Sequence, residues 1–277
     1  MEKILSVAEM QSVEREANEQ GLSYKVMMEN AGNNLAFWIN REYRPCSPRT
    51  VLALVGSGKN GGDALIALCK LVDLGWRTSA IIVRSRMDTD PLIQRYLQVG
   101  GSIVNTQVQD VKATLPVLFQ HASVVIDGVL GTGARLPLPE DLARILEYSR
   151  QLITQSSRKI FVVAVDCPSG ANCDNGEVAK EAIPADVTYT MAGVKQGLLK
   201  FPAANLIGTI QVGRIGDLTI STIWNQVNRG VLCDDDIFPN LPPRPRDAHK
   251  GTFGTALIVG GSGNYPGATL LSGEAAY

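Results

Sequence analysis

Histidine and closely spaced cysteine, the residues that most often build transition-metal sites, are scarce in this chain. Its 277 residues include two histidines and five cysteines. The cysteines are Cys46, Cys69, Cys167, Cys173 and Cys233. Their spacing is not that of a zinc site, and an odd, scattered set argues against a disulfide framework. Free thiols suit a reducing compartment, so we expect a cytoplasmic protein.

Net charge and long apolar runs are also lacking. The 26 basic and 27 acidic residues leave a formal charge of -1, so no basic field that would hold nucleic acid is expected. No segment approaches the roughly 20 apolar residues that span a bilayer, and residues 1–6 lack a signal-type apolar run. We therefore expect neither a nucleic-acid partner nor a membrane partner. With 45% hydrophobic residues, the chain can bury one sizeable core plus an appendage.

The most informative segment is an apolar strand pattern that leads into a glycine-rich turn. Residues 51–55 (VLALV) precede 56–63 (GSGKNGGD), and an apolar helical pattern follows from Ala64 to Leu74. Glycines allow a sharp turn and a close approach to phosphate, and a helix N-terminus favours negative charge. The glycine spacing also matches the G-x-G-x-x-G pattern of dinucleotide-binding folds. Taken alone, the pattern fits a tight strand-to-helix connection without a ligand almost equally well.

Two further loops begin with an aspartate where an apolar strand pattern stops. Asp127 opens the sequence DGVLGTG, and Asp166 opens DCPSG. Either aspartate by itself would be explained as a turn residue. In an open parallel sheet, however, the carboxyl ends of the strands face one crevice where ligands bind. We therefore predict that loops 56–63, 127–137 and 166–170 converge in one pocket.

Strand and helix patterns alternate along most of the chain. Two helices are predicted in the first 45 residues, capped by Ser6 and Ser23. Strands are then predicted at 51–55, 78–83, 102–105, 123–126, 160–165, 186–191 and 208–213, and helices at 63–74, 91–99, 111–119 and 140–152. This alternation predicts an α/β fold, namely a Rossmann-like three-layer α/β/α sandwich with a mostly parallel central sheet.

A proline-rich segment separates this pattern from the last residues. Pro239, Pro242, Pro243 and Pro245 predict a stiff linker. Beyond it we expect one strand at 256–259, a glycine loop and a helix that begins at Pro266. These elements are too few to make a domain.

Five motifs in a fixed order carry a resemblance to a known family. They are residues 28–32 (MENAG), 56–63 (GSGKNGGD), 127–133 (DGVLGTG), 166–170 (DCPSG) and 185–188 (ADVT). Together they resemble the YjeF N-terminal domain family, which contains the NAD(P)H-hydrate epimerases. The resemblance covers roughly residues 1–220, and the motifs are far more specific jointly than singly.

A second resemblance lies near the end of the chain. Residues 246–254 (RDAHKGTFG) and 259–268 (VGGSGNYPGA) are similar to the start of the ADP/ATP-dependent NAD(P)H-hydrate dehydratase domain, which is ribokinase-like. We therefore expect an epimerase domain at 1–225, and a linker with an incomplete dehydratase start at 226–277. Either the chain is a truncated or split piece of a bifunctional epimerase/dehydratase, or its last residues dock elsewhere. In both cases we expect no dehydratase activity from this chain.

The resemblance implies a substrate, a cation and a set of site residues. The substrate would be hydrated NADH or NADPH, whose two epimers the family interconverts for cofactor repair. The substrate-binding positions would be Lys59, Asn60, Gly61, Gly62, Asp63, Gly131, Thr132, Gly133, Ala134, Arg135, Leu136, Pro137 and Asp166. A potassium ion would be held by Asn60, Asp127 and Ser169, whose oxygen donors suit a large monovalent cation.

The catalytic group is expected to be a carboxylate at a strand end. We predict that Asp127 transfers the proton, because it leaves the strand beside the Gly131–Gly133 turn, and that Asp166 holds substrate hydroxyl groups. We also expect a homo-oligomer, and a dehydratase domain or chain is a candidate partner.

Two departures from the family and two alternative functions remain. The usual turn has Asn where Lys59 stands and Gly where Ala64 stands, which leaves the effect of these two residues on substrate binding open.

One alternative function is a catalytically inactive scaffold or binding module. The other is an NADP-dependent dehydrogenase, because Arg84 and Arg86 follow the second strand where a 2′-phosphate contact is usual. Against it, no Tyr-x-x-x-Lys pair or second domain offers a proton donor.

Overall fold

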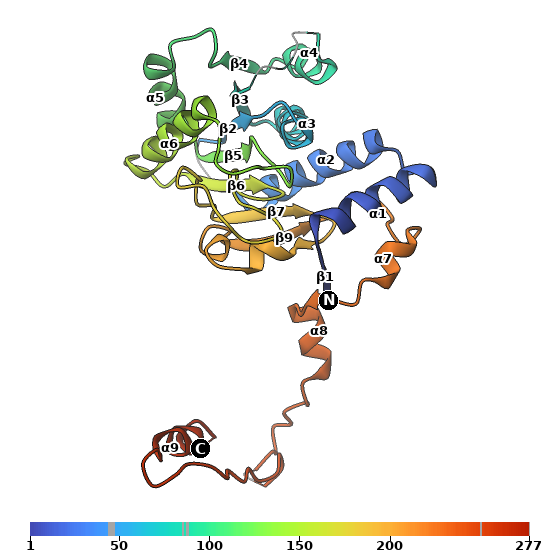
Figure 1. Cartoon of the computed structure of the whole chain (residues 1–277), viewed down its shortest axis with the longest axis vertical. Coiled ribbons are helices and arrows are strands. Elements are labelled where there is room, and N and C mark those ends of the chain that lie inside the picture. Colours follow the sequence, from blue (N-terminus) through green and yellow to red (C-terminus); the bar gives the residue numbers. More distant parts are fainter. Residues whose placement is uncertain (44–47, 85, 87–88, 250, 277) are drawn as a thin grey trace. The chain divides into compact units, whose positions relative to one another are not determined.

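The computed structural model describes residues 1–43, 48–84, 86, 89–249 and 251–276. Cys46, Lys250 and Tyr277, which belong to patterns discussed above, lie outside the described residues. The chain divides into two compact units, Met1–Leu232 and Cys233–Tyr277. The first unit carries the sheet and its helices (Figure 1).

The core of the first unit is a parallel sheet with the strand order β4-β3-β2-β5-β6-β7-β9. Every pairing between these neighbours is parallel. The strands are β2 (Thr50–Val55), β3 (Arg77–Ile82), β4 (Ser102–Asn105), β5 (Val124–Gly128), β6 (Phe161–Val165), β7 (Val187–Met191) and β9 (Thr209–Gly213). This confirms the predicted α/β fold, with a sheet that is wholly rather than mostly parallel.

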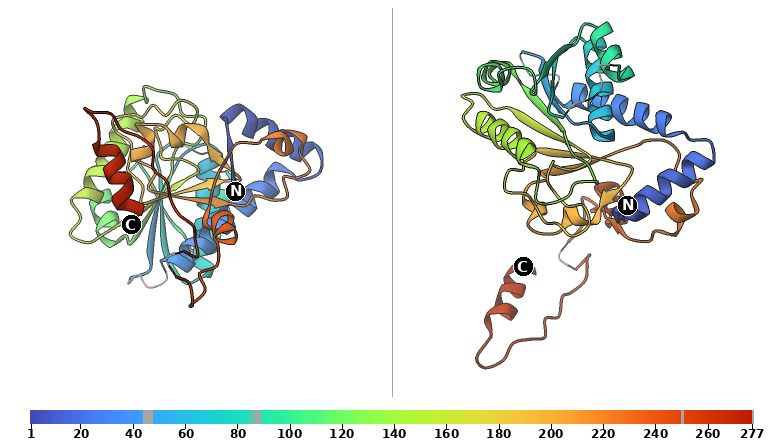
Figure 2. Two further views of the ribbon diagram at one scale, coloured as in Figure 1. Left: turned by 90° about the horizontal axis from the view of Figure 1, so that it is seen from below. Right: turned by 45° about the horizontal axis from the view of Figure 1, so that its top comes forward.

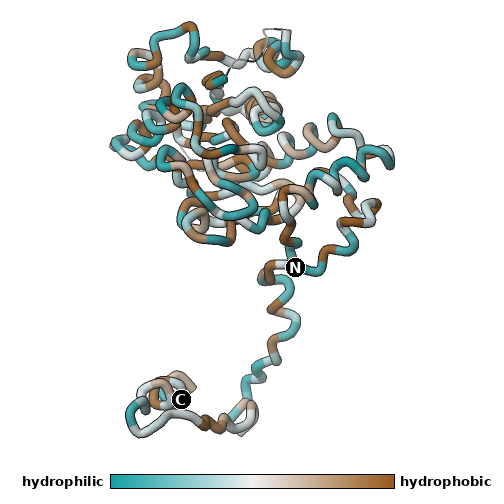
Figure 3. The backbone as a smooth tube through the Cα atoms, viewed as in Figure 1, coloured by the Kyte–Doolittle hydropathy of each residue, from teal (hydrophilic) through white to brown (hydrophobic). Residues whose placement is uncertain are grey.

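Helices cover both faces of the sheet, as Figures 1 and 2 show. On one face lie α1 (Val7–Glu19), α2 (Tyr24–Glu42), α3 (Lys59–Asp73) and α4 (Pro91–Gln98), and on the other α5 (Val111–His121) and α6 (Glu140–Thr154). Alternate residues of a strand point to opposite faces. Val51 and Ala53 accordingly pack in the core of the first face, and Leu52 and Leu54 in that of the second. Figure 3 shows the resulting concentration of hydrophobic residues along the central strands.

The two N-terminal helices begin at the predicted caps. The Ser6 hydroxyl accepts a hydrogen bond from the Glu9 amide at 3.2 Å, and the Glu9 carboxylate accepts from the Ser6 amide at 2.7 Å. The Ser23 hydroxyl accepts from the Val26 amide at 3.3 Å. These bonds satisfy backbone donors that have no partner within the helix.

The structure corrects the predicted start of α3. The helix begins at Lys59 rather than at 63, because Gly58 is its N-cap and the Gly58 carbonyl accepts from the Gly62 amide at 3.2 Å. The second half of the glycine-rich turn is therefore the first helical turn. The side chains of residues 59–62 therefore project from a helix. The free backbone amides at the N-terminus of α3 lie beside the glycine-rich turn.

A small second sheet was not predicted. It has the order β10-β1-β8 and consists of β1 (Glu2–Leu5), β8 (Val194–Lys195) and β10 (Gly230–Val231). Strands of two to four residues are too short to show an alternating pattern. Short 3-10 turns at Gln196–Leu199 and Ala203–Asn205, and helix α7 (Thr222–Gln226), complete the first unit.

The second unit contains the helices α8 (Asp234–Ile237) and α9 (Gly267–Ala276) and a short 3-10 turn at Phe238–Asn240. The strand predicted at 256–259 is not formed. A strand needs a neighbour that completes its hydrogen bonds, and none of the described residues of this unit forms one. Leu257 and Val259 are accordingly 87% exposed.

Candidate functional site

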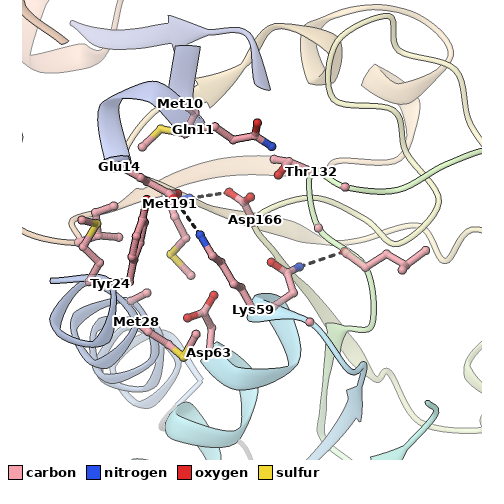
Figure 4. A pocket seen from close by; sticks show the side chains of 18 of the residues that line it. Met10, Gln11, Glu14, Tyr24, Met28, Lys59, Asp63, Thr132, Asp166 and Met191 are labelled. Carbon is pink, nitrogen blue, oxygen red and sulfur yellow. Dashed lines mark hydrogen bonds and ion pairs between the residues drawn. The ribbon is translucent and has the colours of Figure 1, made fainter. Parts of the chain in front are cut away.

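A cavity of about 390 Å³ lies where the loops after β2, β5 and β6 meet. Helices α1 and α2 close it from the side (Figure 4). The lining from the three predicted loops comprises Ser57, Gly58, Lys59, Asn60, Asp63, Val129, Leu130, Gly131, Thr132, Gly133 and Asp166. The convergence predicted from the sequence is therefore present at the carboxyl ends of the strands.

Two glycines allow the loops to approach one another. A Cβ atom at Gly56 would lie 1.9 Å from the Val129 carbonyl oxygen, and one at Gly61 would lie 2.0 Å from the Gly56 oxygen. Both distances are far inside van der Waals contact with backbone that cannot move aside. The glycine spacing is therefore required by packing between the loops, independently of any ligand.

Some predicted substrate-binding residues do not line the cavity. Gly61 packs beneath Gly56, and Gly62 lies against the sulfur of Met28. Ala134 and Arg135 are not in the lining either, and Leu136–Pro137 border a separate hollow beside residues 177–181. The loop after β5 thus offers its first half, up to Gly133, to a ligand in this cavity.

Asp127, Asn60 and Ser169 form a buried cluster behind the cavity. Asp127 is fully buried; its Oδ2 accepts from the Ser169 amide at 2.8 Å, and its Oδ1 from the Ser169 hydroxyl at 2.5 Å. The Asn60 amide nitrogen donates to the carbonyls of Leu130 (3.0 Å) and Val165 (2.5 Å). Burial raises the pKa of Asp127, and the bonds from Ser169 oppose this rise. Asp127 is absent from the cavity lining, whereas Asn60 is part of it.

Asp166 faces the cavity and forms an ion pair with Lys195. The side chain of Lys195 is 1% exposed, and its ammonium also donates to the Met191 carbonyl at 2.8 Å. The Asp166 backbone has φ +65°, a conformation that Asp tolerates better than most residues. The hydrogen bonds that the Asp166 side chain accepts from described residues, including those from the Met191 amide and the Thr190 hydroxyl, all go to Oδ1. Oδ2 is thus available to a ligand.

Four more charged side chains belong to the lining, namely Glu14, Lys59, Asp63 and Arg84. Lys59 pairs with Glu14 at 2.9 Å, and its ammonium lies 4.6 Å from the Tyr24 ring centre. Asp63 projects into the same space from α3 (Figure 4). Burial, together with the negative charge of Asp166, raises the pKa of Asp63 well above its usual value. Arg84 also lines the cavity, and its guanidinium lies 3.7 Å from the Asp141 carboxylate.

One wall of the cavity is apolar and was not predicted from the sequence. It consists of Met10, Met27, Met28, Met191 and Ile215. The sequence analysis did not predict Lys195, Glu14 and Tyr24 as cavity residues either. These residues come from α1, α2 and the segment after β7, so only tertiary structure brings them to the loops. The tandem methionines beside the first motif were the one local signal of this wall.

The fold and cavity define a class of protein. A parallel, doubly covered sheet with a partly polar cavity at the carboxyl ends of its strands is typical of Rossmann-like proteins that bind small ligands. Residues 24–197 match the family described as YjeF-related protein N-terminus. The chain belongs to this family.

Relatives support the assignment. Proteins named bifunctional NAD(P)H-hydrate repair enzyme Nnr are 30% identical in Dictyoglomus turgidum, over 94% of this chain and 49% of the relative, and 34% identical in Pyrobaculum aerophilum, over 100% and 52%. The chain thus spans about half the length of these curated relatives. The crystal structure of yeast ynu0 has the same fold, with a TM-score of 0.68 and 19% identity over 84% of this chain and 98% of the yeast chain. In the described residues, no helix is both long and apolar enough to cross a membrane.

Proposed function

We propose that this chain is an NAD(P)H-hydrate epimerase. Its relatives carry the name of an NAD(P)H-hydrate repair enzyme, and its cavity combines a glycine-rich turn, an apolar wall and acid–base groups. Hydration adds water across a ring double bond of the reduced nicotinamide and produces two epimers at the carbon that bears the hydroxyl. Interconversion of these epimers is the proposed reaction. A dehydratase region would complete the repair in the full-length relatives.

The observation that carries the proposal is the buried Asp166–Lys195 pair at the cavity surface. Loss and return of the hydroxyl at the ring carbon require proton transfer, and a positioned carboxylate is suited to it. Lys195 and the Met191 amide bind Oδ1 of Asp166 and hold the carboxylate in place. The position of Oδ2 is therefore fixed as well. Asp127 was expected to transfer the proton, but its two oxygens are engaged away from the cavity. We therefore assign proton transfer to Asp166.

The proposed potassium site is the cluster of Asn60, Asp127 and Ser169. These residues bring an amide, a carboxylate and a hydroxyl together, with the Leu130 and Val165 carbonyls close by. Burial raises the pKa of Asp127, and the groups that oppose this rise are neutral, with no basic side chain among them, so a cation suits this donor set. Bound potassium would supply a positive charge that fixes the loops after β5 and β6. Replacing it with a large organic cation at constant ionic strength should lower activity.

The remaining lining indicates how the substrate would lie. The free backbone amides at the start of α3 and the Lys59 ammonium suit the pyrophosphate. The methionine wall is apolar and adaptable, which suits the uncharged reduced ring. Asp166 lies in the same cavity, so it can meet the ring while the phosphates contact the glycine-rich turn.

The test is epimer exchange in a mixed hydrate preparation, followed by a method that separates the two forms. The wild-type protein should equilibrate a sample enriched in one epimer. Asp166→Asn should lower the rate by about 10² or more, whereas Asp73→Asn, an exposed change at the far end of α3, should not. Binding without exchange would favour the inactive binding module, and hydride transfer to an added carbonyl substrate would favour the dehydrogenase.

A further inference from the structure

One carboxylate in the cavity differs from the others. Glu14 is paired with Lys59 and Asp166 with Lys195. The side chain of Asp63 has no hydrogen bond or ion pair to any described residue, although only 8% of the residue is exposed. It projects from the second turn of α3 toward the cavity (Figure 4). A carboxyl group that faces a cavity without a protein partner is available to a ligand there.

We propose that Asp63 is a second catalytic residue, which donates a proton to the substrate while Asp166 accepts one. This inference rests on the proposed epimerase function. It is carried by the geometry: the carboxyl groups of Asp63 and Asp166 face one cavity from different elements, and of these two only Asp166 has a cationic partner among the described residues.

The surrounding charges separate the two carboxyl groups chemically. Burial and the negative charges of Asp166 and Glu14 raise the pKa of Asp63 well above its usual value, and the ammonium groups of Lys59 and Lys195 oppose this rise only in part. The ammonium of Lys195 pairs directly with Asp166, whereas Asp63 has no such partner among the described residues. The other ionisable side chains in the lining are the Tyr24 phenol and the Arg84 guanidinium. The two carboxyl groups therefore differ in their charged neighbours, as an acid and a base in one site should.

The two groups suffice for the proton transfers of epimerisation. Asp63 protonates the hydroxyl oxygen on the ring carbon; the carbon–oxygen bond breaks, its electron pair leaves with water, and the ring nitrogen lone pair forms a carbon–nitrogen double bond. Water then adds to the opposite face of this carbon, and its proton passes to Asp166. The carbon–nitrogen electron pair returns to nitrogen. Proton exchange with solvent restores Asp63 to the acid and Asp166 to the base, so no oxidant or reductant is consumed.

The experiment compares pH profiles of kcat/KM for the full chain. The wild-type rate should fall at high pH as Asp63 loses its proton. Asp63→Asn should lower the rate by about 10² and abolish the alkaline fall, and Asp63→Glu should restore part of both. Asp73→Asn on the same helix is the matched control and should retain the wild-type profile.

A readout without turnover completes the test. The infrared difference spectrum between wild type and Asp63→Asn at neutral pH should contain the carbonyl band of one protonated carboxylic acid. Near-normal turnover of Asp63→Asn, an unchanged alkaline limb or the lack of this band would overturn the inference. If Asp166→Asn were then still inactive, the proposed function would stand. Lack of epimer exchange by the wild type would instead refute the proposed function itself.

Discussion

Residue 166 joins an unusual backbone conformation to a buried ion pair. Asp166→Asn keeps a side chain that tolerates the positive φ, but it leaves the buried Lys195 ammonium without its counter-charge. We expect it to lower the free energy of unfolding by about 3 kcal/mol or more, the usual result of breaking a buried pair. The double change Asp166→Asn with Lys195→Met should recover most of this loss without recovering activity. Urea unfolding of the three proteins measures it, and equal instability of the single and double variants would contradict it.

The Asp63 carboxyl links stability to pH. Its pKa is raised in the folded protein, so its favourable contribution is complete below the usual pKa of aspartic acid and is lost as the pH rises through the folded value. Asp63→Asn cannot ionise and escapes this loss. The variant should therefore gain stability relative to wild type at about pH 8 compared with about pH 4. Denaturant unfolding at both pH values checks this, and Asp73→Asn should show no such change. A constant difference between variant and wild type would be inconsistent with a raised pKa.

Individual site residues were predictable where they follow a strand. The aspartates at 127 and 166 and the glycine-rich turn could be placed because the end of each apolar strand pattern fixes their position. Their roles could not, since Asp127 and Asp166 have the same local pattern and differ only in burial and in partners. Lys195 lies on a two-residue strand whose pairing with β1 spans most of the chain, and no local pattern reports such a contact.

At the scale of single elements, α6 contains an unfavourable position. Ser149 is fully buried, and its hydroxyl has no hydrogen-bond partner in the described structure. Ser149→Ala removes this group and introduces a better helix former, so it should stabilise the protein by about 1 kcal/mol. Activity should not change, because α6 packs on the face of the sheet away from α1–α3. Thermal unfolding and the epimer assay test both parts, and a lower midpoint would reveal an unrecognised partner.

The success of the element predictions depended on element length. Strands of four to six residues and helices of eight or more have a hydrophobic period that can be recognised in the sequence. The strands of the large sheet were accordingly predicted to within a few residues. The start of α3 was placed too late because glycines normally argue against a helix, whereas here they occupy its first turn. Residues 256–259 have the composition of a strand, but a strand also needs a neighbouring strand to pair with, which composition does not reveal.

For the molecule as a whole, the cavity and both cores belong to one compact unit. Every lining residue lies between Met10 and Ile215, within Met1–Leu232. A protein that stops after Leu232 should therefore keep its cooperative thermal transition and its epimer exchange rate. Calorimetry and the exchange assay on both lengths measure this. A broad transition or lost exchange in the shorter protein would show that residues 233–277 contribute to the fold or the site.

The methionine wall makes the cavity sensitive to oxidation. Peroxide converts a thioether into a sulfoxide, a polar and chiral group that no longer offers an apolar surface to a flat ring. Met28 is only partly buried and lies in the lining together with Met10, Met27 and Met191, so an oxidant small enough to enter can reach sulfur there. Mild peroxide treatment should raise KM more than it lowers kcat, and methionine sulfoxide reductase should reverse the effect. The proposed epimerase would thereby lose substrate affinity under oxidative stress.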